Sequence, residues 1–246
     1  MKVYFIGAGP GDPELLTLKG KRLLGQAGYC LYAGSLVNKE ILKYARPDAK
    51  KYNTHNMSLE EQVKIFKRAR AKGEDVARLH TGDPALYGAI QEQMKALESL
   101  DIDYAVVPGV SSFLAAAASL KQELTLPGVS QTVILTRLGE KTPVPEKESL
   151  KTLAQARATL CLFLSARQLK KAVEELLPFY GADCPAAVIY KSTWKEEKII
   201  RASLSELAQK ASKEGIKKTA LVIVGWVLAR GSGPAAFERS RVYQSD

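Results

Sequence analysis

The chain has 246 residues, of which 46% are apolar, enough for one large α/β domain or two compact ones with cores of their own. A formal net charge of +10 gives a surface that attracts anions, such as nucleic acid, an acidic membrane or a polycarboxylated small molecule. Three scattered cysteines, two histidines and no apolar run of about 18 residues exclude a disulfide framework, a histidine-rich metal centre and a membrane-spanning helix.

The first half of the chain alternates short β-rich apolar runs with longer amphipathic stretches, a pattern typical of α/β proteins. It begins with a predicted strand over residues 3–6, whose apolar run is too short for a signal peptide, so we expect a cytoplasmic protein with buried free thiols. The other predicted strands are residues 29–32, 76–80 and 104–107, and the predicted helices are residues 13–26, 58–72, 84–97 and 112–120. Ser58 and Glu61 form the pattern of a capping box.

The second half begins with a turn at Pro127-Gly128, after which the predicted strands are residues 132–136, 160–164, 186–190, 198–201 and 220–224. We therefore predict two α/β domains with parallel or mixed sheets. The first spans residues 1–115 and carries three glycine-containing loops, and the second spans residues 116–246. Two such domains would leave a cleft between them, where small ligands usually bind.

The first loop, residues 7–14, lies between a predicted strand and a predicted helix, the position of a dinucleotide-binding fingerprint. It departs from that fingerprint because Asp12 replaces the third glycine and Pro10 lacks the N–H that a phosphate would need. The Asp12 carboxylate also competes for the positive end of the helix. We predict Asp12 as the N-cap, Pro13 as the first helical residue, and a backbone that approaches another molecule closely at its glycines.

Two more strand ends repeat this arrangement. Residues 81–84 (TGDP) follow one predicted strand, with Asp83 predicted as an N-cap and Pro84 as the first helical residue, and residues 108–112 (PGVSS) follow another. Three such loops in one domain predict a shelf of backbone N–H and C=O groups that faces a ligand at one edge of a sheet.

These motifs resemble those of the tetrapyrrole methylases. The likeness is carried by residues 7–17 (GAGPGDPELLT), 81–88 (TGDPALYG) and 108–112, and it continues through residues 188–194 (VIYKSTW) and 219–225 (TALVIVG). It extends over nearly the whole chain. The resemblance implies a homodimer of two α/β domains that hold a methyl donor, S-adenosylmethionine, folded in their cleft, without a metal and with a fold unlike that of Rossmann methyltransferases.

Within this family, three segments look most like the corrin branch that methylates C11 of precorrin-4 or cobalt-precorrin-4: residues 32–36 (YAGSL), 80–84 (HTGDP) and 124–132 (LTLPGVSQT). Thr81 stands where uroporphyrinogen methylases usually carry glycine, which favours the corrin branch. The resemblance therefore implies a role in cobalamin biosynthesis, with or without cobalt in the substrate.

Carried over position by position, the resemblance implies two groups of donor-binding residues. Those of the first domain are Pro10, Thr81, Gly82, Asp83, Leu86, Ser111 and Ser112, and those of the second are Leu164, Tyr190, Ser192 and Ala220. A corrin precursor carries several carboxylates, for which the basic surface is suited, and Arg137 and Lys191 are candidate partners. The sequence identifies no catalytic base, and we do not nominate His80.

Three alternatives remain open from the sequence. The chain could be a uroporphyrinogen-type or other precorrin methylase, or a methylase of RNA or protein built on the same fold. It could also be a non-enzymatic nucleotide-binding module. No stripe of interleaved basic and aromatic residues supports nucleic-acid binding, and Pro10 and Asp12 disfavour nucleotide phosphates. A small-molecule substrate, with no nucleic acid or membrane partner, is therefore the preferred hypothesis.

Overall fold

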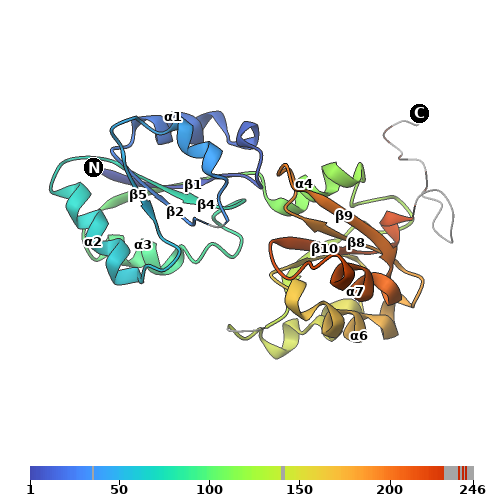
Figure 1. The fold of residues 1–246 in the computed structure, drawn as a ribbon. Helices are drawn as coiled ribbons and strands as arrows, with labels where there is room; N and C mark the ends of the chain where they lie inside the picture. The colour runs from blue at the N-terminus through green and yellow to red at the C-terminus, as the bar shows by residue number, and fades with distance from the viewer. Residues whose placement is uncertain (35, 140–141, 230–237, 239, 241, 243–246) are drawn as a thin grey trace. The chain divides into compact units, whose positions relative to one another are not determined.

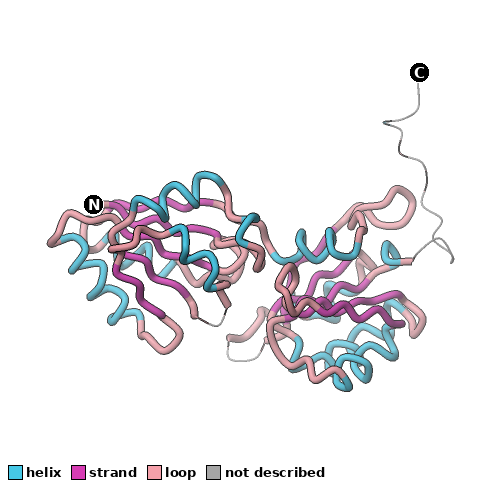
Figure 2. Tube along the Cα trace, turned by 45° about the horizontal axis from the view of Figure 1, so that its top comes forward, coloured by secondary structure: helices cyan, strands magenta, loops and turns pink. Residues whose placement is uncertain are grey.

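The computed structural model covers residues 1–246 and describes all of them except 35, 140–141, 230–237, 239, 241 and 243–246. Ser35, part of the motif at residues 32–36, therefore lies outside the described residues. The chain divides into two compact units, Met1–Ala115 and Ala116–Asp246. Each unit contains a five-stranded sheet lined by helices (Figure 1, Figure 2), so the predicted α/β class is confirmed.

The first unit holds a parallel sheet with the strand order β3-β2-β4-β1-β5. Its strands are β1 (Lys2–Gly7), β2 (Tyr29–Tyr32), β3 (Lys50–Asn53), β4 (Val76–His80) and β5 (Asp103–Val107). Its helices are η1 (Pro13–Leu15), α1 (Leu18–Gln26), η2 (Lys39–Tyr44), α2 (Leu59–Arg70) and α3 (Gln91–Glu98). A further helix, α4 (Ser112–Leu120), begins in this unit and ends in the second. Because all five strands are parallel, their carboxyl ends lie at one edge of the sheet.

Apolar side chains alternate along these strands and supply a core on each face of the sheet. Ile6 and Leu79 are buried on one face in a cluster with Leu24 of α1. Phe5 is buried on the other face in a cluster with Phe66 of α2. Figure 1 shows α1 on one side of this sheet and α2 and α3 on the other. This covering on both faces explains why the inner strands are largely apolar, although β4 also buries Arg78 and His80.

The second unit holds a mixed sheet with the order β6-β7-β10-β8-β9, in which β6 and β7 are parallel and the other neighbours antiparallel. Its strands are β6 (Val133–Arg137), β7 (Thr159–Phe163), β8 (Pro185–Tyr190), β9 (Lys198–Ser203) and β10 (Ala220–Val224). The helices are η3 (Glu146–Glu148), α5 (Leu150–Ala154), η4 (Ala166–Gln168), α6 (Leu169–Tyr180), α7 (Leu204–Lys213) and η5 (Trp226–Leu228). Leu162, Leu176 and Leu207 join the sheet, α6 and α7 in one buried cluster.

Each predicted strand is confirmed, with boundaries that differ from the prediction by at most two residues. The sequence does not predict β3, because its residues KKYN contain no apolar run. As an edge strand, β3 pairs with β2 on one side and leaves Lys50 and Lys51 exposed. Charged residues of this kind protect an edge from pairing with another chain.

Two of the four predicted helices are confirmed with nearly the predicted bounds, α2 and α4. The capping box is also confirmed, since Glu61 N donates to Ser58 Oγ at 3.3 Å and Ser58 N donates to Glu61 Oε2 at 2.8 Å. Two backbone N–H groups at the start of α2 are thereby satisfied.

The helix predicted over residues 13–26 is wrong as a single element. Asp12 is the predicted N-cap and accepts from Glu14 N at 2.8 Å, but the 3-10 helix that follows ends at Leu15, and Leu16 is extended with a ψ of 129°. Thr17 then starts α1 by accepting from Gly20 N at 3.1 Å. A second N-cap residue inside the predicted helix therefore divides it.

The helix predicted over residues 84–97 is also wrong in its first half, because α3 begins at Gln91. Tyr87 and Ala89 have positive φ values of 56° and 48°, which a right-handed helix does not accommodate. Pro84 is therefore a loop residue, and the second glycine loop is longer than predicted.

The three cysteines, Cys30, Cys161 and Cys184, are free and buried as expected, and burial raises the pKa of each thiol to about 12. Among the described helices, none combines the length and apolar character needed to cross a bilayer.

Candidate functional site

The three glycine-containing loops meet at the carboxyl edge of the first unit's sheet. Because β4, β1 and β5 are parallel neighbours, the loops that follow them leave the sheet on the same side. Gly82 N donates to Gly9 O at 2.8 Å, and Gly9 N donates to Gly82 O at 3.2 Å. The loops that the sequence predicts to lie together therefore do so, and the first two are joined through their backbones.

The first and third loops touch where two glycines face each other. A Cβ built on Gly109 would lie 2.3 Å from Gly82 O and 2.6 Å from Gly7 Cα, and a Cβ built on Gly7 would lie 2.5 Å from Gly109 Cα. Contacts this short are too close for a side chain, so only glycine permits this packing. From the sequence we expect the glycines to let the backbone approach another molecule. Gly7 and Gly109 instead let two loops of the protein itself pack together.

Asp83 joins the second loop to the third. Its Oδ1 accepts from Ala85 N at 2.8 Å, and its Oδ2 accepts from Gly109 N at 2.9 Å. The prediction that Asp83 caps an α-helix is wrong, because the residues after it form a turn and α3 begins only at Gln91. The carboxylate instead satisfies one N–H in its own loop and one in the third loop, and hydrogen bonds to a charged acceptor are among the stronger ones.

Gly82 is buried beside the third loop, with that loop's backbone in ordinary van der Waals range of its Cβ position. Its φ of +63° lies in the left-handed region, and a Cβ built there would meet backbone atoms of Val110, Ser111 and Ser112 only at 3.7–4.0 Å. A larger side chain would fill this space beside the third loop.

The structure places all seven predicted donor-binding residues of the first unit on these loops. Pro10, Gly82 and Ser111 are buried, Asp83, Leu86 and Ser112 are half-buried, and Thr81 is exposed. Their assignment to a donor stays a prediction.

Leu36 and Asn38, which follow β2, border the shelf, and the sequence reasoning did not assign them a role. Thr81 Oγ1 donates to Leu36 O at 2.9 Å, and Asn38 Nδ2 donates to Gly11 O at 2.9 Å. These bonds connect the loop after β2 to the second and first loops. The Thr81 hydroxyl therefore has a structural partner within the protein, a role that glycine at this position could not supply.

His80 ends β4 directly before the second loop. Its side chain is 6% exposed, and its ring lies 5.9 Å from that of Phe5. Burial lowers its pKa from 6.5 to about 3, with a further lowering from the nearby charge of Arg78. His80 is therefore neutral at neutral pH and unsuited to exchange protons there, which agrees with leaving it out of the candidate bases.

The low pKa of His80 predicts a pH dependence of stability. The unfolded state binds a proton at this site below pH 6.5, and the folded state does not bind it until the pH is near 3, so stability falls as the pH falls. We expect the free energy of unfolding to decrease from pH 6.5 to about 5 by at most about 1.4 kcal/mol per pH unit from this site, and His80→Leu to remove that slope. Urea denaturation at a series of pH values measures it.

The matched control for this prediction is the other histidine, His55, which is exposed. In His55→Gln, the free energy of unfolding should still decrease as the pH falls from 6.5 to about 5, as in wild type. A slope that is the same in wild type and His80→Leu would contradict the assignment.

In the second unit, the four predicted donor-binding residues lie at one edge of the mixed sheet. β10 is antiparallel to β7 and β8, and Ala220 at its start pairs with Tyr190 at the end of β8. Leu164 comes directly after β7 and is 65% exposed, and Ser192 follows β8. The topology therefore brings together residues that are more than 50 positions apart in the sequence.

Backbone strain is concentrated at this edge. Leu164, Lys191, Thr193 and Thr219 all have positive φ, between 46° and 66°. Non-glycine residues rarely adopt this conformation, and it is sterically less favourable for the two threonines, which branch at Cβ, than for leucine or lysine. Strained backbone often persists where a function requires it, which supports this edge as a functional region.

The two predicted substrate-binding cations already have partners in the protein. Arg137 Nη1 donates to Thr142 O at 3.0 Å. Lys191 Nζ lies 3.6 Å from a Glu196 carboxylate oxygen and 5.1 Å from the centre of the Trp194 ring. A substrate carboxylate would compete with these contacts, and the role of both residues stays a prediction.

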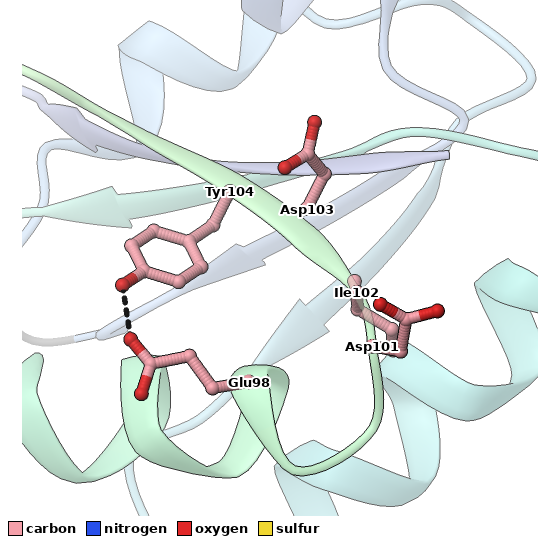
Figure 3. A pocket seen from close by; sticks show the side chains of 5 residues that line it. All are labelled: Glu98, Asp101, Ile102, Asp103 and Tyr104. Carbon is pink, nitrogen blue, oxygen red and sulfur yellow. Dashed lines mark hydrogen bonds between the residues drawn. The ribbon is translucent and has the colours of Figure 1, made fainter.

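A cavity of about 430 Å³ lies elsewhere, at the amino end of β5. Figure 3 shows its lining, including Glu98 and Tyr104, whose side chains hydrogen-bond to each other, and two aspartates, Asp101 and Asp103. The glycine loops leave the opposite edge of the same sheet. The acidic lining also repels a polycarboxylated substrate, so this cavity is not the candidate site.

Comparison with known proteins identifies the family. The family model of the tetrapyrrole (corrin/porphyrin) methylases matches residues 2–208. The cobalt-precorrin-4 C(11)-methyltransferase of Methanocaldococcus jannaschii is 50% identical, over 100% of this chain and 93% of the relative. The precorrin-4 C(11)-methyltransferase of Pseudomonas aeruginosa is 48% identical, over 100% of this chain and 96% of the relative.

Two solved structures agree with this match. The X-ray structure of a cobalt precorrin-4 methyltransferase has a TM-score of 0.90 and 46% identity, covering 93% of this chain and 96% of that one. The uroporphyrin-III C-methyltransferase of Thermus thermophilus, solved with S-adenosylhomocysteine, has a TM-score of 0.79 and 31% identity, covering 93% and 99%. With a family model that matches most of the sequence, relatives near 50% identity and the same fold, the chain belongs to the tetrapyrrole methylases.

Proposed function

We propose that this protein is an S-adenosylmethionine-dependent methyltransferase that transfers a methyl group to C11 of precorrin-4 or cobalt-precorrin-4 in cobalamin biosynthesis. The observation that carries the proposal is the match along the whole chain to two relatives of that name at 50% and 48% identity. The uroporphyrin-III methyltransferase is more distant in sequence, at 31%, which ranks the corrin substrate above the porphyrin one.

We propose that each unit contributes donor-binding residues: those on the loop shelf of the first unit and those at the strained edge of the second. The three glycine-containing loops, whose backbones meet at one edge of the sheet, support the first part. The buried hydroxyl of Ser192, which has no hydrogen-bond partner in the described part of the chain, supports the second. Leu164, Tyr190 and Ala220 share that edge and complete the proposed contacts.

S-adenosylmethionine, when bound, supplies a methyl group that its sulfonium centre has already activated. The protein therefore needs to provide position and a dry environment rather than a nucleophile. Carbonyl oxygens of the loops and the half-buried ring of Tyr190 are suited to a cationic ligand. The Asp83 carboxylate orders the second and third loops through its bonds to Ala85 N and Gly109 N, which holds the shelf in one conformation.

For the acceptor we propose a polycarboxylated tetrapyrrole, in keeping with the net charge of +10. Arg137 and Lys191 are the proposed carboxylate partners. We also propose that the protein acts as a homodimer in the cytoplasm. The free buried thiols support a reducing compartment.

The decisive experiment incubates the protein with S-adenosylmethionine carrying a 13C methyl group and with precorrin-4, cobalt-precorrin-4 or uroporphyrinogen III. NMR of the product then locates the label. Label at C11 of either precorrin would support the proposal and decide between the metal-free and cobalt-containing acceptors. Label on uroporphyrinogen III alone, or on none of the three acceptors, would overturn it.

A large side chain at position 82 tests the proposed donor site. We expect Gly82→Leu to lower the affinity for S-adenosylhomocysteine by at least about tenfold, because the side chain would occupy the space beside the third loop, and a displaced ligand contact of about 1.4 kcal/mol has that effect. Calorimetric titration measures the affinity. Gly73→Leu is the matched control, since Gly73 has the same left-handed φ of +65° with open space around it. Equal affinity in both variants would contradict the proposed site.

A further inference from the structure

We propose that Glu197 is a positioning residue, which holds the turn of residues 191–193 so that the Ser192 hydroxyl is presented to the methyl donor; this inference rests on the function proposed above. Glu197 lies between β8 and β9, five positions after Ser192. The motifs at residues 188–194 and 219–225 do not include it.

The turn at residues 191–193 needs to be held in place because its backbone is strained. Lys191 and Thr193 have φ values of 46° and 66°, and left-handed backbone is unfavourable for threonine because its side chain branches at Cβ. Two backbone bonds support the turn, from Lys191 N to Thr219 O at 2.9 Å and from Trp194 N to Lys191 O at 3.0 Å. Neither bond engages the N–H of Thr193, the more strained residue.

Glu197 bonds to that N–H group. Its Oε2 accepts from Thr193 N at 2.7 Å and from Ser119 Oγ at 2.8 Å. Glu197 and Ser119 are half-buried, where a charge-assisted hydrogen bond is stronger than in open solvent. The carboxylate therefore connects the strained residue to the carboxyl-terminal part of α4 and favours the left-handed conformation of Thr193.

The strained turn carries a buried hydroxyl group, that of Ser192. Ser192 lies between the two left-handed residues, is 6% exposed, and its Oγ has no hydrogen-bond partner among the described residues. Leaving a buried hydroxyl unpaired costs stability. Such a cost persists when the group serves a ligand, and the same sheet edge carries Tyr190 and Ala220.

The neighbouring carboxylate, Glu196, does not have this role. Its side chain is 62% exposed and pairs with Lys191 Nζ at 3.6 Å, and exposed ion pairs contribute little. Glu196 therefore provides a matched control at the adjacent position, with the same chemistry and no bond to the backbone of the turn.

The test is calorimetric titration of the full-length protein with S-adenosylhomocysteine. We expect Glu197→Ala to weaken binding by about tenfold to a hundredfold, the range that corresponds to loss of a charge-assisted hydrogen bond. Glu197→Gln, which keeps an acceptor oxygen, should bind within about threefold of wild type, as should Glu196→Ala. In turnover assays Glu197→Ala should raise KM for the donor more than it lowers kcat.

A second substitution separates positioning from general damage to the fold. Glycine adopts left-handed backbone without steric cost, so Thr193→Gly in the Glu197→Ala background should recover part of the lost affinity. Recovery would support the proposal. Unchanged affinity in Glu197→Ala, equal losses in the Ala and Gln variants, or no recovery with Thr193→Gly would overturn it. Failure of wild type to bind S-adenosylhomocysteine would instead refute the proposed function itself.

Discussion

Alanine in place of Gly109 should destabilise the protein by about 3 kcal/mol or more, at or above the upper end of the cost of overpacking. The new Cβ would lie 2.3 Å from Gly82 O and 2.6 Å from Gly7 Cα. Both contacts are with backbone, which cannot rotate away as a side chain would. The third loop must therefore move away from the first and second loops. Urea denaturation measures the free energy of unfolding. Calorimetric titration should show that this variant also binds S-adenosylhomocysteine more weakly than wild type does.

Gly73→Ala is the control for this variant. Gly73 has a φ of +65° but open space around it, so alanine there costs about 1 kcal/mol from left-handed backbone alone. A Gly109→Ala variant no less stable than Gly73→Ala would show that the loops are not packed backbone against backbone.

Removal of the Asp83 carboxylate should have the second largest effect. Asp83→Ala deletes the bonds from Ala85 N and Gly109 N, at 2.8 and 2.9 Å, and we expect it to lower stability by about 2–3 kcal/mol, since bonds to a charged acceptor contribute more than neutral ones. The second and third loops would no longer be connected by a side chain. The affinity for S-adenosylhomocysteine should therefore fall by more than the tenfold expected for a single lost contact.

Asp83→Asn provides the matched comparison, because its amide keeps one acceptor oxygen and presents N–H₂ to the other donor. It should retain one of the two bonds and lie between wild type and Asp83→Ala in both stability and affinity. If the asparagine and alanine variants bind as tightly as wild type, the carboxylate does not order the site.

Much of the fold follows from local sequence. The apolar runs predict β1, β2, β4 and β5 and the strands of the second unit, because an apolar strand in a covered sheet is a local pattern. The start of α2 is predictable in the same way, since Ser58 and Glu61 satisfy each other within one turn. The sequence does not predict β3, because this segment is a strand through its pairing with β2 and not through its own composition.

The positions of the loops at one edge also follow from sequence, once strands and helices alternate and the strands are parallel. The sequence by itself also determined the family, through motifs spread along the whole chain. It did not distinguish why each glycine is present. Gly7 and Gly109 face each other across 102 positions, and only the folded sheet brings their backbones into contact.

Tertiary structure alone decided the roles that depend on partners distant in the chain. Asp83 has the sequence of an N-cap but bonds to Gly109 N, and Thr81 bonds to the loop after β2. Glu197 is an ordinary charged residue in the sequence, yet its carboxylate bonds to Thr193 N and Ser119 Oγ. Local sequence determines which segments form strands and turns through short-range sterics and burial, whereas hydrogen bonds between loops exist only after the sheets have placed those loops side by side.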